Sequence, residues 1–592
     1  IQNPGLSLAT PGAAPVGVPN FFIDKFRIPP FLLSIYQAAG IEYGIRWEVL
    51  AAINEIETDY GRNLNVSSAG AMGWMQFIPS SWKAYGVDAN GDGRKDPYNP
   101  ADAIFAAARY LKAAGTQTDL RRAIFAYNHA NWYVESVMLR AKLVRALPND
   151  LVNALTGLTQ GRFPVAGQVR YPKKGGSPDG VLIDARQDAP VIAVSDGVVK
   201  RYGRSKRLGL HLVLEDAHGN RYTYAHLAAV SRTYPVPRGR KPGEAEVEHA
   251  GHAGHADGAD PKPRKPASAG KPRAQSRTRT VRVMKERLFA HPARPAAMPN
   301  GGERQLGDMS AELPAGATVS DYFTADFPLE RSDIVLKAMR PGAQVIGGTI
   351  LGRAGKRAIR FRVRPAGKGA PAINPRPVLD GWRLLEATEI HKGKALRGFG
   401  ARNPSIGRLM LMSKEALARH VLADRRIRIY ECGRRDVATG AIDRRVLITL
   451  SYLASSGLHP LVSALKCGHS YYTSGGAVSW HSSGNGVDIA SINGKAILGN
   501  QGKGSITDVT IRRILTLQGH MRPGQIISLM TFAGHSNTIA MSDHADHIHL
   551  GWQPRNAGVA GPAGADAAVL RPQQWKRLVD GLDRIDNPEV RR

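Results

Sequence analysis

The first side chain in this sequence that is suited to catalysis is a glutamate on the apolar face of a predicted helix. Apolar spacing from Trp47 to Thr58 predicts a helix whose apolar stripe contains Val49, Leu50, Ile53 and Ile56. Glu57 falls inside this stripe, whereas Glu48 and Glu55 fall on the opposite face. A carboxyl group on an apolar face is costly to ionise, so its pKa should rise toward the value that a general acid needs near neutral pH. The pattern also fits a partly exposed glutamate at the end of a helix that Gly61 terminates.

Three motifs surround this glutamate in chain order. They are Ile56-Glu-Thr-Asp-Tyr-Gly61, the stretch from Ser68 to Trp82 (SAGAMGWMQFIPSSW) and Ala126-Tyr-Asn-His129. Together they resemble the lytic transglycosylases with a lysozyme-like fold. The resemblance implies an all-α domain that cuts peptidoglycan glycan strands, with Glu57 as the sole catalytic carboxyl group. It also implies a sugar groove lined by Gln76, Tyr127 and Asn128. The aromatic residues Trp74, Phe77 and Trp82 fit either a hydrophobic core or a sugar platform.

A single catalytic carboxyl group limits the types of glycosidic cleavage that the domain can catalyse. A two-carboxylate glycosidase needs a partner that activates water or forms a covalent intermediate. Asp59 is a poor partner for Glu57, because it lies two residues further on and points elsewhere on the helix. In the resembled family, Glu57 would protonate the glycosidic oxygen and then act as a base while the muramic acid 6-hydroxyl closes a 1,6-anhydro ring. We therefore expect a transglycosylase acting on MurNAc-GlcNAc bonds, and not a hydrolase.

An acidic loop between predicted helices has the spacing of an EF-hand. Oxygen-bearing side chains alternate from Asp88 through Asn90 and Asp92, glycine occupies the sixth position, and Asp96 follows. Asn99 occupies the twelfth position, where a bidentate glutamate is usual. Some lytic transglycosylases carry a calcium loop at a similar place. The loop is predicted to bind calcium weakly, or to be a plain Asn/Gly turn.

A second constellation, near the C-terminal end of the sequence, has the residue types of a zinc site. His481 and Asp488 are seven residues apart, and His547-Ile-His549 follows about 60 residues later. Two imidazoles and one carboxylate form a common catalytic zinc set that leaves one position for water. Alternate residues of a strand point the same way, so His547 and His549 can face one site. Asp546 is close enough to act as a base on a zinc-bound water.

These motifs resemble the family of D-Ala-D-Ala metallopeptidases and hedgehog-type domains, together with murein endopeptidases. The resemblance implies His481, Asp488 and His549 as zinc ligands, with His547 and Asp546 as transition-state and base residues. An aspartate stands where many members have glutamate. The alternatives are a zinc-binding but inactive domain, or surface histidines without a metal. His469 and His544 are expected around the site or on the surface.

A middle region resembles the lysostaphin-type (M23) zinc endopeptidases but lacks their ligands. Ala189 to Gly197 and Tyr224-Ala-His-Leu227 carry the resemblance, which resumes at Gly342 to Gly347. Active members need His-x-Gly-x-Asp and His-x-His, which here read Gly180-Val-Leu-Ile-Asp184 and Ala358-Ile-Arg360. Asp184 and His226 alone cannot complete a zinc site. We expect a catalytically inactive domain that serves for binding or spacing.

The elements that position these residues follow from periodicity and length. At 592 residues the chain is too long for one core, and three or four domains are expected. Helical spacing runs from about 30 to 147, short strands follow at 163–227 and 334–365, and an α/β region spans about 385–553. The fold class is therefore multidomain: an all-α lysozyme-like domain, a mainly-β M23-like domain and an α+β zinc-peptidase-like domain. The expected segments are a Pro/Gly/Ala-rich leader (1–19), the transglycosylase domain (20–147), the M23-like domain (160–234 and 335–385), a basic insert (235–334), the metallopeptidase-like domain (386–555) and a tail (556–592) with a short amphipathic helix.

The net charge of the chain gives information about its binding partners and not about its fold. There are 80 Lys+Arg against 49 Asp+Glu, a net charge of +31. No aromatic-basic motif favours nucleic acid, so the basic insert is expected to attract anionic wall polymers or phospholipid surfaces. The insert is predicted to be disordered, and its His249, His252 and His255 fit a solvated run or a metal site. No apolar stretch is long enough for a transmembrane helix.

The remaining sequence features concern location. The two cysteines, Cys432 and Cys467, fit either a disulfide in an exported protein or two free thiols. The first residue, Ile1, fits a chain whose signal peptide has been removed, or a shortened chain. All three domains indicate peptidoglycan strands and stem peptides as partners and a place outside the cytoplasm. Two alternatives remain: a non-enzymatic wall-binding scaffold, and a zinc peptidase whose first domain only clamps glycan.

Overall fold

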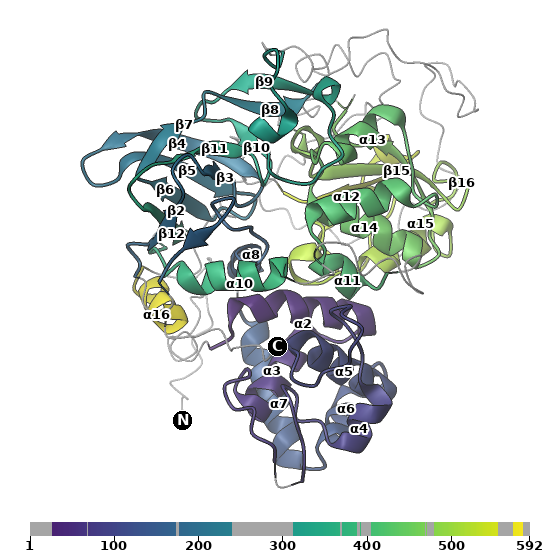
Figure 1. The fold of residues 1–592 in the computed structure, drawn as a ribbon. Coiled ribbons are helices and arrows are strands. Elements are labelled where there is room, and N and C mark those ends of the chain that lie inside the picture. Colours follow the sequence, from purple (N-terminus) through teal and green to yellow (C-terminus); the bar gives the residue numbers. More distant parts are fainter. Residues whose placement is uncertain are drawn as a thin grey trace, which may run out of the picture.

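The structure is a computed structural model that describes residues 27–67, 69–147, 149–172, 177–238, 312–367, 370–387, 391, 404–467, 469, 479–553 and 572–583. Within these ranges three regions follow one another along the chain (Figure 1). The first is helical, the second consists mainly of strands, and the third combines helices with a mixed sheet. No helix in the described ranges is both long and apolar enough to cross a membrane.

The first region is a helical bundle around α3 (Trp47–Thr58). The other helices are α2 (Pro30–Tyr43), α4 (Pro79–Tyr85), α5 (Pro100–Ala113), α6 (Leu120–Tyr127), α7 (Asn131–Arg145) and α8 (Asn149–Gly157). The side chains of Leu50 and Ile53 on α3 are fully buried, as the predicted apolar stripe requires. The α3 helix ends at Asp59, whose backbone is left-handed with φ of 50°. The helical region extends past the expected limit at 147, because α8 also packs against α2.

The middle region is built from antiparallel sheets. A seven-stranded sheet has the order β1-β2-β12-β6-β5-β4-β10, and three-stranded and two-stranded sheets, β3-β11-β7 and β8-β9, accompany it. The strands of the middle region are β1 (Val169–Arg170), β2 (Val181–Ala185), β3 (Pro190–Ile192), β4 (Gly197–Ser205), β5 (Gly209–Asp216), β6 (Arg221–Ala225), β7 (Leu227–Val230), β8 (Thr233–Pro237), β9 (Ile334–Ala338), β10 (Gln344–Val345), β11 (Ile350–Ala354) and β12 (Ile359–Arg364). Strands from both sides of the predicted insert therefore share one sheet.

The predicted limits of the basic insert, 235–334, are wrong at both ends. The β8 strand continues to Pro237 and pairs along its whole length with β9. Short 3-10 helices, η2 (Val319–Asp321) and η3 (Arg331–Asp333), precede β9. A small core of Leu313, Ile334 and Leu336 holds this part together, and it was hidden in the sequence by the polar composition around it. The central part of the insert, with its three histidines, lies outside the described residues.

The third region packs helices against a mixed sheet. Its helices are α11 (Ile406–Leu411), α12 (Lys414–Ala423), α13 (Glu431–Ala438), α14 (Arg444–Ser455) and α15 (Ile506–Ile514). The preceding helix, α10 (Arg376–Glu386), packs instead against the middle region, where its Trp382 contacts the rings of Tyr222 and Phe361. The sheet order is β13-β14-β15-β19-β17-β18, with β16 beside β15. The strands are β13 (Arg428–Ile429), β14 (Pro460–Ala464), β15 (Gly486–Ile492), β16 (Lys495–Ala496), β17 (Gln525–Ser528), β18 (Thr538–Ala540) and β19 (Ile548–Gly551). The predicted terminal helix is present as α16 (Pro572–Asp583).

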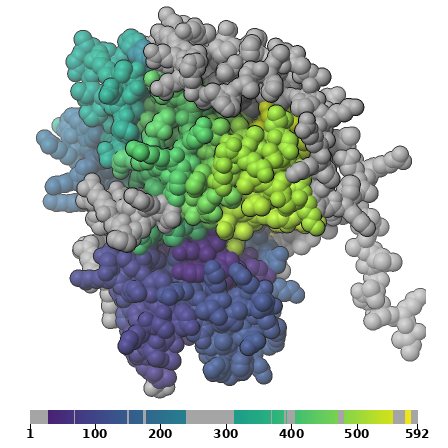
Figure 2. Space-filling model, turned by 90° about the vertical axis from the view of Figure 1, so that its right-hand side faces the viewer, coloured from purple at the N-terminus to yellow at the C-terminus, as the bar shows by residue number. Residues whose placement is uncertain are grey.

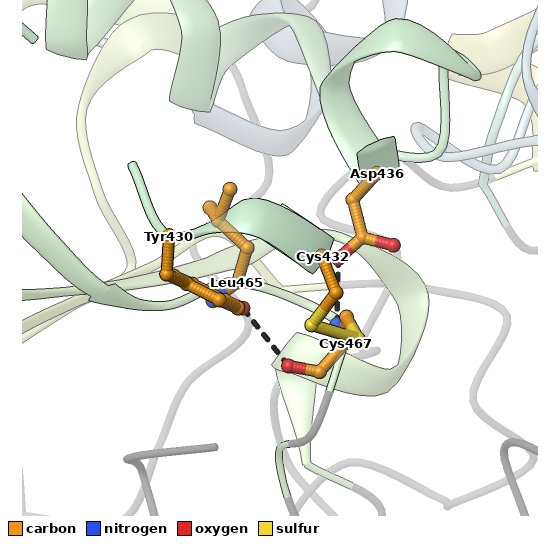
Figure 3. The surroundings of a disulfide bond; sticks show 5 residues. All are labelled: Tyr430, Cys432, Asp436, Leu465 and Cys467. Carbon is orange, nitrogen blue, oxygen red and sulfur yellow. Dashed lines mark hydrogen bonds between the residues drawn. A yellow bond between two sulfur atoms is a disulfide. The ribbon is translucent and has the colours of Figure 1, made fainter. Parts of the chain in front are cut away.

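A disulfide joins the two cysteines of the third region. Cys432 lies in α13 and Cys467 follows β14, and their Cα atoms are 5.9 Å apart. Figure 3 shows that Tyr430 and Asp436 bind the same segment: the Tyr430 hydroxyl donates to the Cys467 carbonyl, and the Cys467 amide donates to Asp436. The end of β14 is therefore held to α13 by one covalent bond and two hydrogen bonds.

The three regions meet at a buried polar junction. Figures 1 and 2 show the helical region directly below the third region, with α2 along the boundary. Nδ1 of His520 lies 2.7 Å from Oε1 of Gln37 on α2, and its Nε2 lies 2.8 Å from Nε2 of Gln160. Gln518 adds a further link, because its side chain bonds to the backbone of Ile45 and Trp47. Buried polar groups of this kind need fixed partners, so the junction specifies how the regions sit together.

Candidate active sites

Glu57 is a half-buried carboxyl group with a single hydrogen-bond donor against it. The Tyr133 hydroxyl, from α7, donates a hydrogen bond of 2.5 Å to Oε1 of Glu57. Burial raises the pKa of Glu57 to about 7, although the hydrogen bond from Tyr133 lowers it in part. Among the described residues no cation pairs with this carboxylate. Both the protonated and the ionised form of Glu57 are therefore populated near neutral pH, as a group that acts first as acid and then as base requires.

The burial of Glu57 differs less from that of the other two glutamates of α3 than their positions relative to the apolar stripe suggested. Glu48 and Glu55 are also half-buried, and burial raises the pKa of both, because α7 and neighbouring loops cover much of α3. Their partners distinguish them: Glu55 lies 3.4 Å from Arg140, and Arg46 and Arg145 lower the pKa of Glu48. Glu57 differs from both because its pKa is raised by burial and no cation lowers it.

Asp59 is held away from any catalytic role beside Glu57. Its carboxylate pairs with Arg27 and, at 3.2 Å, with Arg62. These two ion pairs fix the direction of the carboxylate. The described residues thus supply no free second carboxylate next to Glu57, in agreement with the one-carboxyl interpretation of the sequence.

The three residues predicted to line the sugar groove differ in setting. The Tyr127 hydroxyl donates to the Met75 carbonyl, and the pKa of Tyr127 is raised by burial and by the charge of Glu57, which places the two groups near each other. Gln76 has a left-handed backbone, with φ of 47°, and its amide donates to the carbonyls of Asn65 and Gly73. Asn128 is exposed at the end of α6. A polar residue held in a left-handed backbone conformation is typical of a functional site, and Tyr127 is the groove residue whose proximity to Glu57 the structure shows.

The aromatic residues of the second motif belong mainly to the core. Trp74 is fully buried and Phe77 is 4% exposed, whereas Trp82 is half-buried. A different aromatic residue is exposed beside the acid: Trp132 is 64% exposed, and its ring centroid lies 5.8 Å from that of Tyr133. The sequence interpretation missed both Tyr133 and Trp132. Their position directly after the Ala126–His129 motif was the available signal.

In the predicted calcium loop, backbone amides already donate hydrogen bonds to the side-chain oxygen atoms. Asp88 accepts hydrogen bonds from the amides of Gly91, Asp92 and Gly93. Asn99, at the twelfth position, caps α5 by accepting from the Ala101 and Asp102 amides. The buried Asp102 closes the loop by accepting from the amides of Ala89, Asn90 and Asp96. Calcium binding by Asp88, Asn90, Asp92 and Asp96 stays a prediction.

The three predicted zinc ligands converge in the third region. Asp488 on β15 and His549 on β19 are direct partners in the antiparallel register. Oδ1 of Asp488 lies 2.8 Å from Nδ1 of His549 and 3.2 Å from Nε2 of His481, and the two histidine nitrogens are 3.1 Å apart. All three side chains are fully buried. Ligand atoms around a tetrahedral zinc ion lie about 3.3 Å apart for bonds of about 2.0–2.1 Å, so this triangle fits the ion.

Hydrogen bonds around the triangle orient its members. Nδ1 of His481 lies 2.8 Å from the Leu465 carbonyl, so it carries the proton and leaves Nε2 as the ligand atom. Burial opposes ionisation of Asp488, but His481 and His547 outweigh it and hold the pKa of this carboxyl well below its usual range. Oδ2 of Asp488 is buried without a hydrogen bond. A polar atom in that state fits a site built for an ion.

His469 joins this cluster, although the sequence placed it only around the site or on the surface. Ligand atoms of His469, His481 and Asp488 all lie within 4.8 Å of one another. However, the His469 ring stacks on His481 with centroids 3.9 Å apart and planes within 7°. The lone pairs of two parallel rings run side by side and cannot meet at one ion. We therefore favour His549 as the third ligand, with His469 packed against His481.

His547 and Asp546 lie beside the triangle. Nε2 of His547 is 3.9 Å from Oδ1 of Asp488, and its Nδ1 is 2.7 Å from Oδ1 of Asp546. The structure thus brings His547 to the same side as His549, as strand alternation predicts. Asp546 contacts His547 and is positioned to orient this imidazole.

The M23-like residues also come together in the middle region, but they do not form a metal site. His226, directly after β6, binds the Ala358 carbonyl through Nδ1 at 3.1 Å. Arg360 pairs with Leu182 across β2 and β12, two residues before Asp184. A Cβ atom at Gly180 would lie 2.7 Å from Cγ of Arg362 and 3.2 Å from Cγ of Arg360, so arginine stems occupy the space beside Gly180. Cations and a missing donor set make this place unsuitable for zinc.

Comparisons with known proteins concern mainly the first region. The family model "Transglycosylase SLT domain" matches residues 62–124. Membrane-bound lytic murein transglycosylase B of Escherichia coli (strain K12) is 52% identical over 59 residues, which cover 10% of this chain and 16% of that protein. The chain therefore spans only a small part of this relative.

Two solved structures show weaker similarity. A lytic transglycosylase of Escherichia coli in complex with bulgecin A is 20% identical and has a TM-score of 0.18, covering 23% of this chain and 80% of that one. A protein of Ruminococcus gnavus, named provisionally as the glycyl-glycine endopeptidase LytM, is 13% identical with a TM-score of 0.20, covering 46% and 85%. Such TM-scores add nothing about the fold. The matched sequence family is decisive for one segment: the chain contains a transglycosylase SLT domain.

Proposed function

We propose that the chain is a lytic murein transglycosylase that uses Glu57 as its one acid and base. The observation that carries this proposal is the Glu57 carboxyl group, whose pKa of about 7 allows both its acid and its base form near neutral pH, with no second free carboxylate beside it among the described residues. The transglycosylase SLT domain match supports the same reaction class. The substrate is the MurNAc-GlcNAc bond of peptidoglycan.

The reaction proceeds in two proton transfers. Glu57 first donates its proton to the glycosidic oxygen, and the bond between this oxygen and the muramic acid C1 breaks. The Glu57 carboxylate then accepts the proton of the 6-hydroxyl group, whose oxygen bonds to C1 and closes the 1,6-anhydro ring. The acid is regenerated and no water is consumed. Tyr133 orients Glu57 throughout, and Gln76, Tyr127 and Asn128 line the sugar groove.

Muropeptide analysis tests this assignment. Purified peptidoglycan is digested with the full chain or with Glu57→Gln, which retains the shape of the side chain but cannot donate a proton. The expected products are anhydro ends from the wild type, with a loss of about 10³-fold in Glu57→Gln. Glu55→Gln is a matched control on the same helix and retains activity. Reducing ends without anhydro ends from the wild type would contradict the proposal.

We propose a second activity, a zinc-dependent murein peptidase, for the third region. The triangle of His481, Asp488 and His549 supports it, since its edges of 2.8–3.2 Å suit a tetrahedral ion. A bound zinc ion would supply Lewis-acid polarisation of a peptide carbonyl and of a water molecule. Here His547 is placed to stabilise charge on the reacting peptide, with Asp546 as the proton acceptor. The residues alone do not identify the peptide bond.

Zinc content and peptide products test this second activity separately. Metal analysis by mass spectrometry should find about one zinc ion per molecule of the full chain. The His481→Ala variant should lose this zinc ion and still form the anhydro products. His459→Ala, a histidine of the same region outside the cluster, is the matched control. A chain that binds zinc without cutting stem peptides would leave the third region as a binding domain.

The other expectations are part of the same proposal. The middle region is an inactive relative of M23 peptidases, because arginine stems lie beside Gly180 and Arg360 replaces a ligand. The protein works outside the cytoplasm, where the Cys432–Cys467 disulfide is stable. The rivals, a non-enzymatic scaffold and a peptidase with a glycan clamp, predict no anhydro products from the wild type.

A further inference from the structure

One strand of the middle region presents a row of arginines on a single face. Arg360, Arg362 and Arg364 alternate along β12 with the buried residues Ile359, Phe361 and Val363. In an antiparallel pair, residues directly opposite each other point to the same face. The register therefore adds Arg221 opposite Arg364, and Leu182 opposite Arg360. We call Arg360, Arg362, Arg364 and Arg221, with the nearby Arg207, the arginine face.

The acids near the arginine face are too few to neutralise it. Asp179 lies 3.6 Å from Arg362 and 3.9 Å from Arg207, so two cations share one carboxylate. Glu215 is shared in the same way by Arg221 at 2.6 Å and Lys200 at 3.3 Å. Arg360 and Arg364 have no ion pair within the described part of the chain. Asp184, two residues after Leu182 on the same side of β2, is a third acid near the face. The five arginines and Lys200 still outnumber Asp179, Asp184 and Glu215, so the face carries an excess of positive charge.

A buried donor on this face lacks a partner. Nε of Arg362 is buried without a hydrogen bond among the described residues. Burial lowers the pKa of Arg362, and the neighbouring Arg207, Arg364 and Arg360 lower it further. A buried guanidinium donor in this state favours an anion as its missing partner.

We propose that the arginine face binds a linear phosphodiester polymer of the cell envelope. Alternate residues of a strand are about 7 Å apart, so Arg360, Arg362 and Arg364 form a ladder of charges suited to a chain with one phosphate per short repeat. Arginine forms paired hydrogen bonds with phosphate oxygens. This binding function is independent of glycan or peptide cleavage, and it would hold the enzyme on a wall that carries such polymers.

Other ligands fit the arginine face less well. A stem peptide offers one or two carboxylates, so it cannot pair with all three arginines of β12 at once. A nucleic acid also carries phosphodiesters, but single strands are bound by stacking bases on rings. The residues opposite the three arginines on β6, namely Ala225, Thr223 and Arg221, provide no ring for a base. A poly(glycerol phosphate) chain needs no such ring.

Binding of poly(glycerol phosphate) to the full chain tests the proposal. The triple variant Arg360→Gln, Arg362→Gln, Arg364→Gln should bind at least tenfold more weakly, and the slope of log affinity against log salt should fall by about two. The control replaces three exposed cations of the third region, Arg428, Lys495 and Lys503, by glutamine and so removes the same net charge. This control should retain most of the affinity.

Two further measurements exclude trivial causes. The triple Arg→Lys variant should restore most of the salt slope, because charge is retained, and thermal unfolding without ligand shows whether each variant is folded. Equal loss of binding in the control variant would overturn the proposal, since net charge alone would then explain it. Tighter binding of a single-stranded oligonucleotide than of poly(glycerol phosphate) would overturn it in favour of nucleic acid. Anhydro products should be unchanged in every variant, whatever their polymer affinity.

Discussion

The Tyr133 hydroxyl donates a hydrogen bond of 2.5 Å to Oε1 of Glu57, across 76 positions of sequence. This contact stabilises the ionised carboxylate, whereas burial favours the neutral acid, and burial is the larger effect. The balance leaves the pKa of Glu57 at about 7, close to the pH at which an acid and base of one reaction works best.

The pH dependence of glycan cleavage should follow this balance. The protonated acid is lost as pH rises through the pKa of Glu57, so the rate should fall on the alkaline side of about 7. Tyr133→Phe removes the hydrogen bond that favours ionisation, so the alkaline limb should move to higher pH. Initial rates of anhydro-end formation from pH 5 to 9 measure this shift. Tyr110→Phe, whose hydroxyl donates to the Ala126 carbonyl, is the control. A downward shift in Tyr133→Phe would contradict the assigned role.

Trp132 should contribute to binding of the sugar chain. Its ring is 64% exposed and contacts Tyr133, so stacking on a sugar would bury it beside the acid. Trp132→Ala should raise KM about tenfold and leave kcat nearly unchanged, since the ring does not touch the reacting atoms. Leu139→Ala, which is 58% exposed on the same helix, should change neither constant. Quenching of tryptophan fluorescence by a chitin oligomer offers a second measurement, and it should vanish in Trp132→Phe only if this ring is the one involved.

Calcium should bind the 88–99 loop weakly. Backbone amides already occupy the oxygens of Asp88, and Asn99 caps α5, so the ion must compete with these bonds. With a Kd of about 10⁻³ M, 10 mM calcium stabilises by about 1.4 kcal/mol. Thermal unfolding should rise by a few degrees with calcium and not with sodium at equal ionic strength. Asp88→Asn should abolish the rise, and an unchanged response in this variant would assign the ion to another place.

Loss of the disulfide should destabilise the third region. The bond closes a loop with a sequence separation of 35, for which chain entropy predicts about 4 kcal/mol. The double variant Cys432→Ser, Cys467→Ser should unfold at a lower temperature. Its zinc affinity should also fall, because Cys467 lies two residues before His469, whose ring stacks on the proposed ligand His481. Reductant should lower the unfolding temperature of the wild type and leave the double variant unchanged. Equal sensitivity of both proteins to reductant would show that the effect does not come from this bond.

Local patterns predicted the acid and its helix, but not the partners of the acid. The apolar stripe of α3 places Glu57 correctly, because it depends on residues close in sequence. Tyr133 reaches Glu57 only because α7 packs on α3, which no local pattern reports. The same limit explains why Glu48 and Glu55, placed on the face opposite the apolar stripe, are also half-buried. Burial of a helix depends on all of its neighbours.

The third region shows a similar division. Strand alternation correctly brought His547 and His549 to one side, since its period is fixed by backbone geometry. The pairing of Asp488 with His549 depends on the register between β15 and β19, which are far apart in sequence. His469 was undervalued because nothing near it in sequence indicates that its ring stacks on His481.

The junction of Gln37, His520 and Gln160 has a consequence for how the protein can be dissected. Cutting the chain after the helical region would remove His520, whose backbone amide and ring contact Oε1 of Gln37, and would expose this buried side chain to water. A fragment with only α2 to α7 would also lose α8, whose Thr156 bonds to the same glutamine. Low activity of such a fragment would then report a damaged boundary and not a missing catalytic group. Point variants of the intact chain are therefore the sounder way to assign each activity to its region.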